Sequence, residues 1–186
     1  MTRRNVVLAA IAALAVALPA LAAPLTSGLK PGDSVTPFHP KHLSGPLAGT
    51  NNCFPCTFQE RPQTQVWVNG DDRANVIALA KTLGAQIKAH KAQDYKAMIV
   101  VLTDAKGMPA AEAFVKDAAK TPGTEGVDMA VLDKTSDAVK AYAVNTASAV
   151  KNTVFVYKNW KVAQTFVNLE AADAPKLVAA IGGIAK

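Results

Sequence analysis

An uncharged, almost wholly apolar run of seven residues constrains the fold of this chain most strongly. Ala97 to Thr103 reads A-M-I-V-V-L-T and is bounded by Lys96 and Asp104. A strand with one face in water alternates apolar and polar residues, so an unbroken run of this length indicates a strand that is covered on both faces. The run therefore predicts a central strand in a sheet with helices on both sides.

Segments typical of strands and of helices alternate along the rest of the chain. Short strands are expected at residues 64–69, 127–132, 153–158 and 162–167, and Asn159-Trp160-Lys161 joins the last two in a hairpin. Apolar residues at helical spacing predict helices at residues 76–87, 109–119, 137–142 and from 173 onward. We expect Ala113 and Phe114 to be the buried residues of the second helix. This order predicts an α/β fold with a mixed sheet and helices on both faces.

Residues 1–22 have the pattern of a cleaved signal peptide. Arg3 and Arg4 precede an apolar run from Val6 to Leu18, and small residues at Ala20 and Ala22 suit a cleavage site. The run of 13 residues is short for an anchor, because a bilayer core is about 30 Å thick. The sequence predicts a periplasmic or secreted protein, exported by the general secretory route or, given the adjacent arginines, by the twin-arginine route.

Composition indicates one mildly basic domain after export. The chain has 186 residues and a net charge of +6, two units of which belong to the leader. The remaining charges are scattered, so neither a nucleic-acid partner nor stable membrane insertion after cleavage is expected. Residues 23–63 are rich in proline and predict an extended arm, whereas residues 64–186 carry the predicted strands and helices.

Two cysteines, Cys53 and Cys56, lie in the arm. An even number in an exported chain favours a disulfide. Three interpretations stay open: a pair that exchanges disulfides with other thiols, a passive disulfide that pins the arm, or a tetrahedral zinc or copper(I) site completed by His39 and His42. No other cofactor is expected, because Thr57 stands where covalent haem attachment requires histidine.

Activation of a cysteine thiol would need a positive neighbour. Pro62 leaves room for about one helical turn after the cysteines, so a helix dipole gives little help. Arg61, Lys41 or His42 could supply the charge by proximity, and the sequence does not place them.

The order of segments and several short motifs resemble the thioredoxin fold, and in particular its exported peroxiredoxin-like and cytochrome-maturation-like branch. Gly32-Asp33-x-x-x-Pro37-Phe38 is similar to the opening motif of that branch, and Leu43-Ser44-Gly45 to the short hairpin after it. Residues 139–144 resemble the helix and valine that precede the last two strands of that branch, and residues 152–162 resemble the hairpin that those strands form. The resemblance covers about residues 28–185 and implies a thioredoxin-like mixed sheet flanked by helices, preceded by the arm.

The resemblance also implies a redox site at a fixed place in the fold, but the cysteines of this chain lie elsewhere in the sequence. In redox-active members the C-x-x-C follows the first central strand, but residues 70–73 here read G-D-D-R. The family's cis-proline falls at Asn152, which has no comparable preference for the cis bond. We therefore expect the usual site to be vacant and assign the catalytic positions, if any, to Cys53 and Cys56.

The sequence leaves two classes of function. The favoured hypothesis is an exported thiol–disulfide oxidoreductase in which Cys53 attacks and Cys56 resolves, with protein or small-molecule thiols and disulfides as partners. The alternative is a non-catalytic thioredoxin-fold binding module whose disulfide only fastens the arm. A redox protein would expose the Cys53 sulfur, whereas a passive pin would bury both sulfurs.

Overall fold

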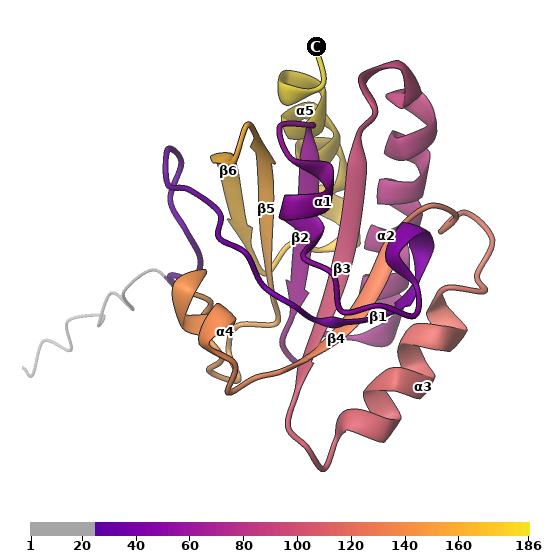
Figure 1. Cartoon of the computed structure of the whole chain (residues 1–186), viewed down its shortest axis with the longest axis vertical. Coiled ribbons are helices and arrows are strands. Elements are labelled where there is room, and N and C mark those ends of the chain that lie inside the picture. The colour runs from indigo at the N-terminus through magenta and orange to yellow at the C-terminus, as the bar shows by residue number, and fades with distance from the viewer. Residues whose placement is uncertain (1–24) are drawn as a thin grey trace, which may run out of the picture.

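The computed structural model describes residues 25–186 (Figure 1), so the expected signal peptide, residues 1–22, lies outside the described residues. The strands are β1 Lys41–Ser44, β2 Gln63–Val68, β3 Lys96–Thr103, β4 Asp128–Asp133, β5 Asn152–Lys158 and β6 Lys161–Val167. The α-helices are α1 Phe54–Phe58, α2 Arg73–Ala89, α3 Met108–Ala118, α4 Asp137–Ala141 and α5 Ala174–Ile184. Short 3-10 turns are η1 Gly45–Leu47, η2 Lys91–Gln93 and η3 Ala171–Asp173.

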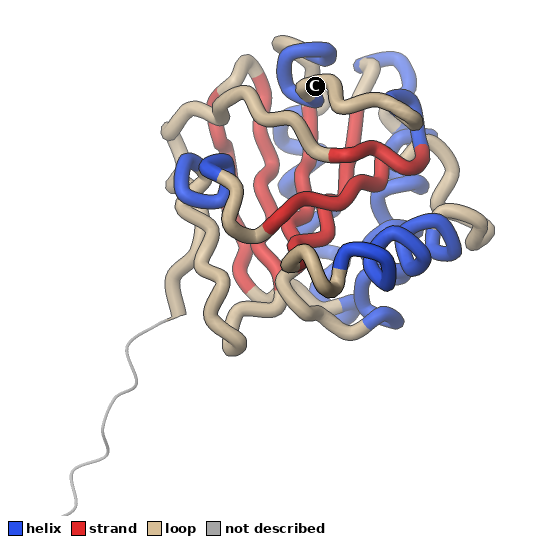
Figure 2. Tube along the Cα trace, turned by 60° about the horizontal axis from the view of Figure 1, so that its bottom comes forward, coloured by secondary structure: helices blue, strands red, loops and turns tan. Residues whose placement is uncertain are grey.

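The strands form one mixed six-stranded sheet in the order β1-β4-β3-β2-β5-β6 (Figures 1 and 2). β2, β3 and β4 are parallel, whereas β1, β5 and β6 are each antiparallel to their neighbours. The apolar run predicted to be central occupies β3, with Ile99 and Val101 packed on one face and Met98 and Val100 on the other. Burial on both faces explains why this strand carries no polar alternation.

Helices cover both faces of the sheet, as expected. α2, α3 and α5 pack on one face through residues such as Leu79, Val115 and Leu177. The arm, α1 and α4 cover the opposite face, where Phe54 and Tyr142 are fully buried (Figure 1). The α/β mixed-sheet prediction is therefore confirmed. None of the helices in residues 25–186 is long and apolar enough to cross a membrane.

The arm contains more regular structure than its sequence predicts. β1 pairs with β4 at the edge of the sheet, and α1 forms a single short helix just before β2. Pairing with β4 satisfies backbone groups that an extended arm would leave to water. α1 begins where Cys53 caps its first turn and Pro55 occupies the second helical position, which needs no amide hydrogen.

Candidate functional site

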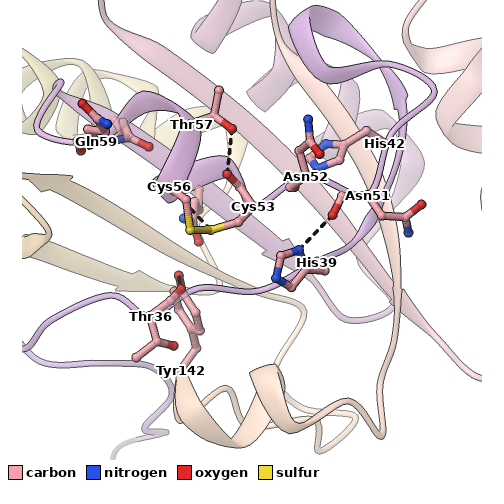
Figure 3. The surroundings of a disulfide bond; sticks show 12 residues. Thr36, His39, His42, Asn51, Asn52, Cys53, Cys56, Thr57, Gln59 and Tyr142 are labelled. Carbon is pink, nitrogen blue, oxygen red and sulfur yellow. Dashed lines mark hydrogen bonds between the residues drawn. A yellow bond between two sulfur atoms is a disulfide. The ribbon is translucent and has the colours of Figure 1, made fainter.

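The two cysteines share the first turn of α1 and form a disulfide, with a Cα–Cα distance of 5.2 Å (Figure 3). Cys53 is the N-cap residue, and Cys56 is the third residue of the helix. The Cys56 amide donates a hydrogen bond to Sγ of Cys53 at 3.1 Å. The C-x-x-C spacing thus places one sulfur where it accepts a free amide of the first helical turn.

The two sulfur-bearing residues differ in exposure. Cys53 is buried, with 5% of its surface exposed, whereas Cys56 is half-buried. Phe54 and Phe58 anchor α1 on the sheet, with their rings 4.8 Å apart in an edge-on contact. Because the apolar side of the short helix faces the sheet, its polar side carries Cys56 toward the surface.

Side chains hold three successive carbonyl groups at the start of α1. Nδ1 of His39 lies 3.0 Å from the Asn51 carbonyl oxygen, and Nε2 of His42 lies 2.8 Å from that of Asn52. The Thr57 hydroxyl donates to the Cys53 carbonyl at 2.9 Å. Figure 3 shows these residues around the disulfide. Side chains from β1, from the arm and from α1 therefore contact the segment that leads into Cys53.

Each cation considered as a thiol activator contacts a carboxylate elsewhere. Lys41 pairs with Glu112 at 2.7 Å, and this hydrogen bond lowers the pKa of Glu112. Arg61 pairs with Asp94, whose pKa is lowered first by its hydrogen bond to Lys96 and then by that to Arg61.

The third residue considered, His42, faces the buried carboxylate of Asp128. All three side chains are thus engaged by carboxylates, and the Cys56 amide is the group that the structure places against a sulfur of the pair.

The metal interpretation finds no support in the positions of the four candidate ligands. His39 and His42 use ring nitrogens for carbonyl oxygens, and both cysteines are in the disulfide. Within residues 25–186, no group of three or more His, Cys, Asp or Glu side chains is arranged to hold a metal ion. A disulfide sulfur lacks the thiolate charge that zinc and copper(I) sites require.

Comparison with known proteins identifies the fold. No protein-family model matches the chain, and no curated protein matches its sequence. A protein from Chlorobium tepidum assigned as thiol:disulfide interchange protein DsbE has a TM-score of 0.62 at 16% identity, covering 85% of this chain and 99% of that one. Peroxiredoxin Q from Xanthomonas campestris has a TM-score of 0.56 at 11% identity, and the match covers 81% of this chain and 92% of that one. The chain has a thioredoxin-like fold. Peroxidoxin BcpB from Mycobacterium tuberculosis is also similar in structure, with a TM-score of 0.57 at 15% identity. The match covers 84% of this chain and 98% of that one.

In a thioredoxin-like fold the redox site is expected where β2 leads into α2, and here that place holds a polar cluster. Asp72 caps α2 through the Ala74 amide at 2.7 Å. The Asp71 carboxylate accepts from the side chains of Asn75 at 2.8 Å and Asn152 at 2.6 Å. No peptide bond within residues 25–186 is cis. The cluster satisfies its own hydrogen bonds and joins the start of α2 to β5.

The disulfide lies on the other side of the sheet from this cluster. Phe54 and Phe58 of α1 pack with Trp67, whereas Val76 and Leu79 of α2 pack on the opposite face of β2. The displaced cysteines therefore do not reach the start of α2, and any partner of the disulfide must approach over the face covered by the arm (Figure 1).

Sequence reasoning did not single out Asp128, which the structure places beside His42. The residue is 0% exposed, and its second carboxylate oxygen accepts from the Leu47 amide at 3.1 Å. A signal was present: Asp128 interrupts the apolar segment 127–132, and a charge in a buried strand needs a partner. The partner lies 86 residues away in sequence, so the pattern alone does not name it.

Proposed function

We propose that the protein is a thiol–disulfide redox protein that acts through the Cys53–Cys56 disulfide. The observation that carries the proposal is the 3.1 Å hydrogen bond from the Cys56 amide to Sγ of Cys53. A sulfur that accepts a backbone amide at a helix start is stabilised as a thiolate, which makes it a better leaving group. Cys56 is only half-buried, so its sulfur is the point at which a partner thiolate attacks.

The proposed exchange begins with a partner thiolate, which attacks Sγ of Cys56. A bond forms between the partner sulfur and Cys56, the Cys53–Cys56 bond breaks, and its electron pair stays on Cys53 as a thiolate. A second thiolate of the partner then attacks the partner's own sulfur in this mixed disulfide and releases Cys56. The partner loses two electrons and becomes a disulfide, and the protein gains them as two reduced cysteines.

This mechanism reverses the roles expected from sequence, in which Cys53 attacks and Cys56 resolves. Burial of Cys53 disfavours direct attack by it on a large partner, and the amide bond suits it to leave and to resolve. When the reduced protein acts on a disulfide, Cys56 attacks first and the Cys53 thiolate closes the pair again. The partners proposed are protein or small-molecule thiols and disulfides.

The proposed site of action is the periplasm or the exterior of the cell. The leader pattern of residues 1–22 supports export, and disulfides persist in these oxidising compartments. Residues 23–63 would then form the arm of the mature protein, and residues 64–186 the remainder of the domain.

Two single-cysteine variants test the assignment. Cys53→Ser keeps a good N-cap residue on α1 and leaves Cys56 as the only thiol, and Cys56→Ser is its matched control. Each is treated with glutathione disulfide, and formation of the mixed disulfide is followed by mass spectrometry. We expect the Cys53→Ser protein to react at least about tenfold faster, because its thiol is the more exposed one.

The other outcomes have definite meanings. Faster reaction of the Cys56→Ser protein would restore Cys53 as the attacking thiol. If neither folded variant reacts while both react in urea, the disulfide is a passive pin and the protein is the non-catalytic binding module. Burial of Cys53 and the vacant site at α2 are the observations that favour this second candidate.

A further inference from the structure

β1 and β4 bury an ionisable pair beside the segment that leads into the disulfide. The residues are His42, 1% exposed, and Asp128, 0% exposed. Nδ1 of the His42 ring contacts one oxygen of the Asp128 carboxylate, and the Leu47 amide donates to the other oxygen at 3.1 Å. The Leu47 amide therefore holds the carboxylate in place, and the carboxylate fixes the orientation of the His42 ring.

The remaining ring nitrogen contacts the segment that leads into Cys53. Nε2 of His42 lies 2.8 Å from the carbonyl oxygen of Asn52, the residue directly before Cys53 (Figure 3). A carbonyl oxygen only accepts hydrogen bonds, so Nε2 carries the hydrogen. This bond holds the peptide plane whose other half is the amide of Cys53.

Stability alone gives a weak reason to bury such a pair. Replacing a buried ion pair by apolar residues of similar volume is often neutral or stabilising, because desolvation offsets the attraction. The nearby His39 shows the contrast, since it is exposed and makes a similar bond to the Asn51 carbonyl without a carboxylate partner. A buried, doubly fixed ring is suited to holding one atom in place.

We propose that His42 is a positioning residue for the redox pair, oriented by Asp128. By holding the Asn52 carbonyl in the reduced protein, it keeps Sγ of Cys53 within reach of the Cys56 amide and sulfur. The two thiols then meet at a higher effective concentration, which favours closure of the disulfide. This inference rests on the proposed redox function of Cys53 and Cys56.

The test uses a neutral background that retains the hydrogen bonds. Asp128→Asn still accepts from the Leu47 amide through its oxygen and donates to Nδ1 of His42 through its nitrogen, which leaves the Nε2 hydrogen on the Asn52 carbonyl. Adding His42→Phe removes that donor without leaving a buried charge behind. His39→Ala, which loses the exposed bond to Asn51, is the matched control.

The readout is the reduction potential of the disulfide in graded thiol buffers. We expect Asp128→Asn and His39→Ala to stay within about twofold of the wild-type equilibrium constant. The double variant should be reduced about tenfold more readily, a rise of about 30 mV for this two-electron couple. A merely structural pair would lower the stability of the oxidised and reduced proteins equally and leave the potential unchanged. An equal potential in the double variant and Asp128→Asn would overturn the inference.

A measurement on the wild-type protein keeps the inference testable if the double variant does not fold. The Nε2 hydrogen of His42 should give a slowly exchanging NMR signal in both the oxidised and the reduced protein, since the His42 side chain is fully buried and its bond to Asn52 partly so. Loss of that signal on reduction would overturn the positioning role. A wild-type potential typical of structural disulfides would instead defeat the proposed redox function, so the two failures are distinct.

Discussion

Gln59 ends α1 in a backbone conformation that favours glycine, with φ 50° and ψ −121°. Two hydrogen bonds hold it there: its amide donates to the Pro55 carbonyl at 2.7 Å, and its carbonyl accepts from the Gln63 side chain at 2.8 Å. A strained residue of this kind costs about 1–3 kcal/mol. Gln59→Gly removes the strain, and the added freedom of the unfolded chain takes back about 0.4–1 kcal/mol.

We therefore expect Gln59→Gly to raise the free energy of unfolding by about 1 kcal/mol, or the melting temperature by about 3 °C for a domain of this size. Unfolding of the oxidised protein in urea measures the free energy of unfolding, and thermal unfolding measures the melting temperature. Glu60→Gly is the control, because Glu60 is exposed without a positive φ and the change should destabilise by about 0.5–1 kcal/mol. A Gln59→Gly protein no more stable than wild type would refute the reasoning.

Three further predictions concern stability. Reducing the disulfide, which closes a loop of four residues, should lower the free energy of unfolding in urea by about 2 kcal/mol. Asn152→Ala should cost about 2–3 kcal/mol in the same assay, because it leaves the Leu169 amide and carbonyl and the Asp71 carboxylate short of a partner. The Gly123 amide, then Lys88, lowers the pKa of Glu125 from 4.5 to about 2. The ionised Glu125 carboxylate therefore stabilises the folded protein above about pH 4.5, and this contribution is lost as the pH falls toward 2. Glu125→Gln should be less stable than wild type near neutral pH and equal to it near pH 2.

Elements with a strong local pattern could be predicted from the sequence. The apolar run at residues 97–103 became β3, and Asn159 and Trp160 form the hairpin turn with positive φ at both positions. Trp67, expected in the core, is 0% exposed. In these cases the residues that decide the structure are close together in sequence, so periodicity and turn chemistry suffice.

Features that depend on tertiary contacts were either not predicted from the sequence or predicted wrongly. α1 has only five residues, too few for a periodic pattern, and it depends on Phe54 packing against the sheet. In α3 the expected buried residues were wrong in part: Ala113 is exposed and Phe114 half-buried, whereas Val115 and Ala118 face the core. Small apolar residues on most sides of α3 do not indicate which face meets the sheet.

The disulfide pair could be predicted, but its surroundings could not. The cysteine count and the predicted export were sufficient to expect a disulfide between Cys53 and Cys56, which the structure contains. The difference in exposure between them depends on how α1 lies against the sheet. The His42–Asp128 contact joins residues from β1 and β4, and no local pattern links two strands so distant in sequence.

The reduction potential of the Cys53–Cys56 disulfide tests the central claim most directly. The protein without residues 1–22 is equilibrated in graded thiol buffers, and free thiols are counted by alkylation. We expect a value between about −120 and −270 mV, the range of proteins that exchange disulfides. A value below about −300 mV would identify a structural disulfide and contradict the proposed redox function.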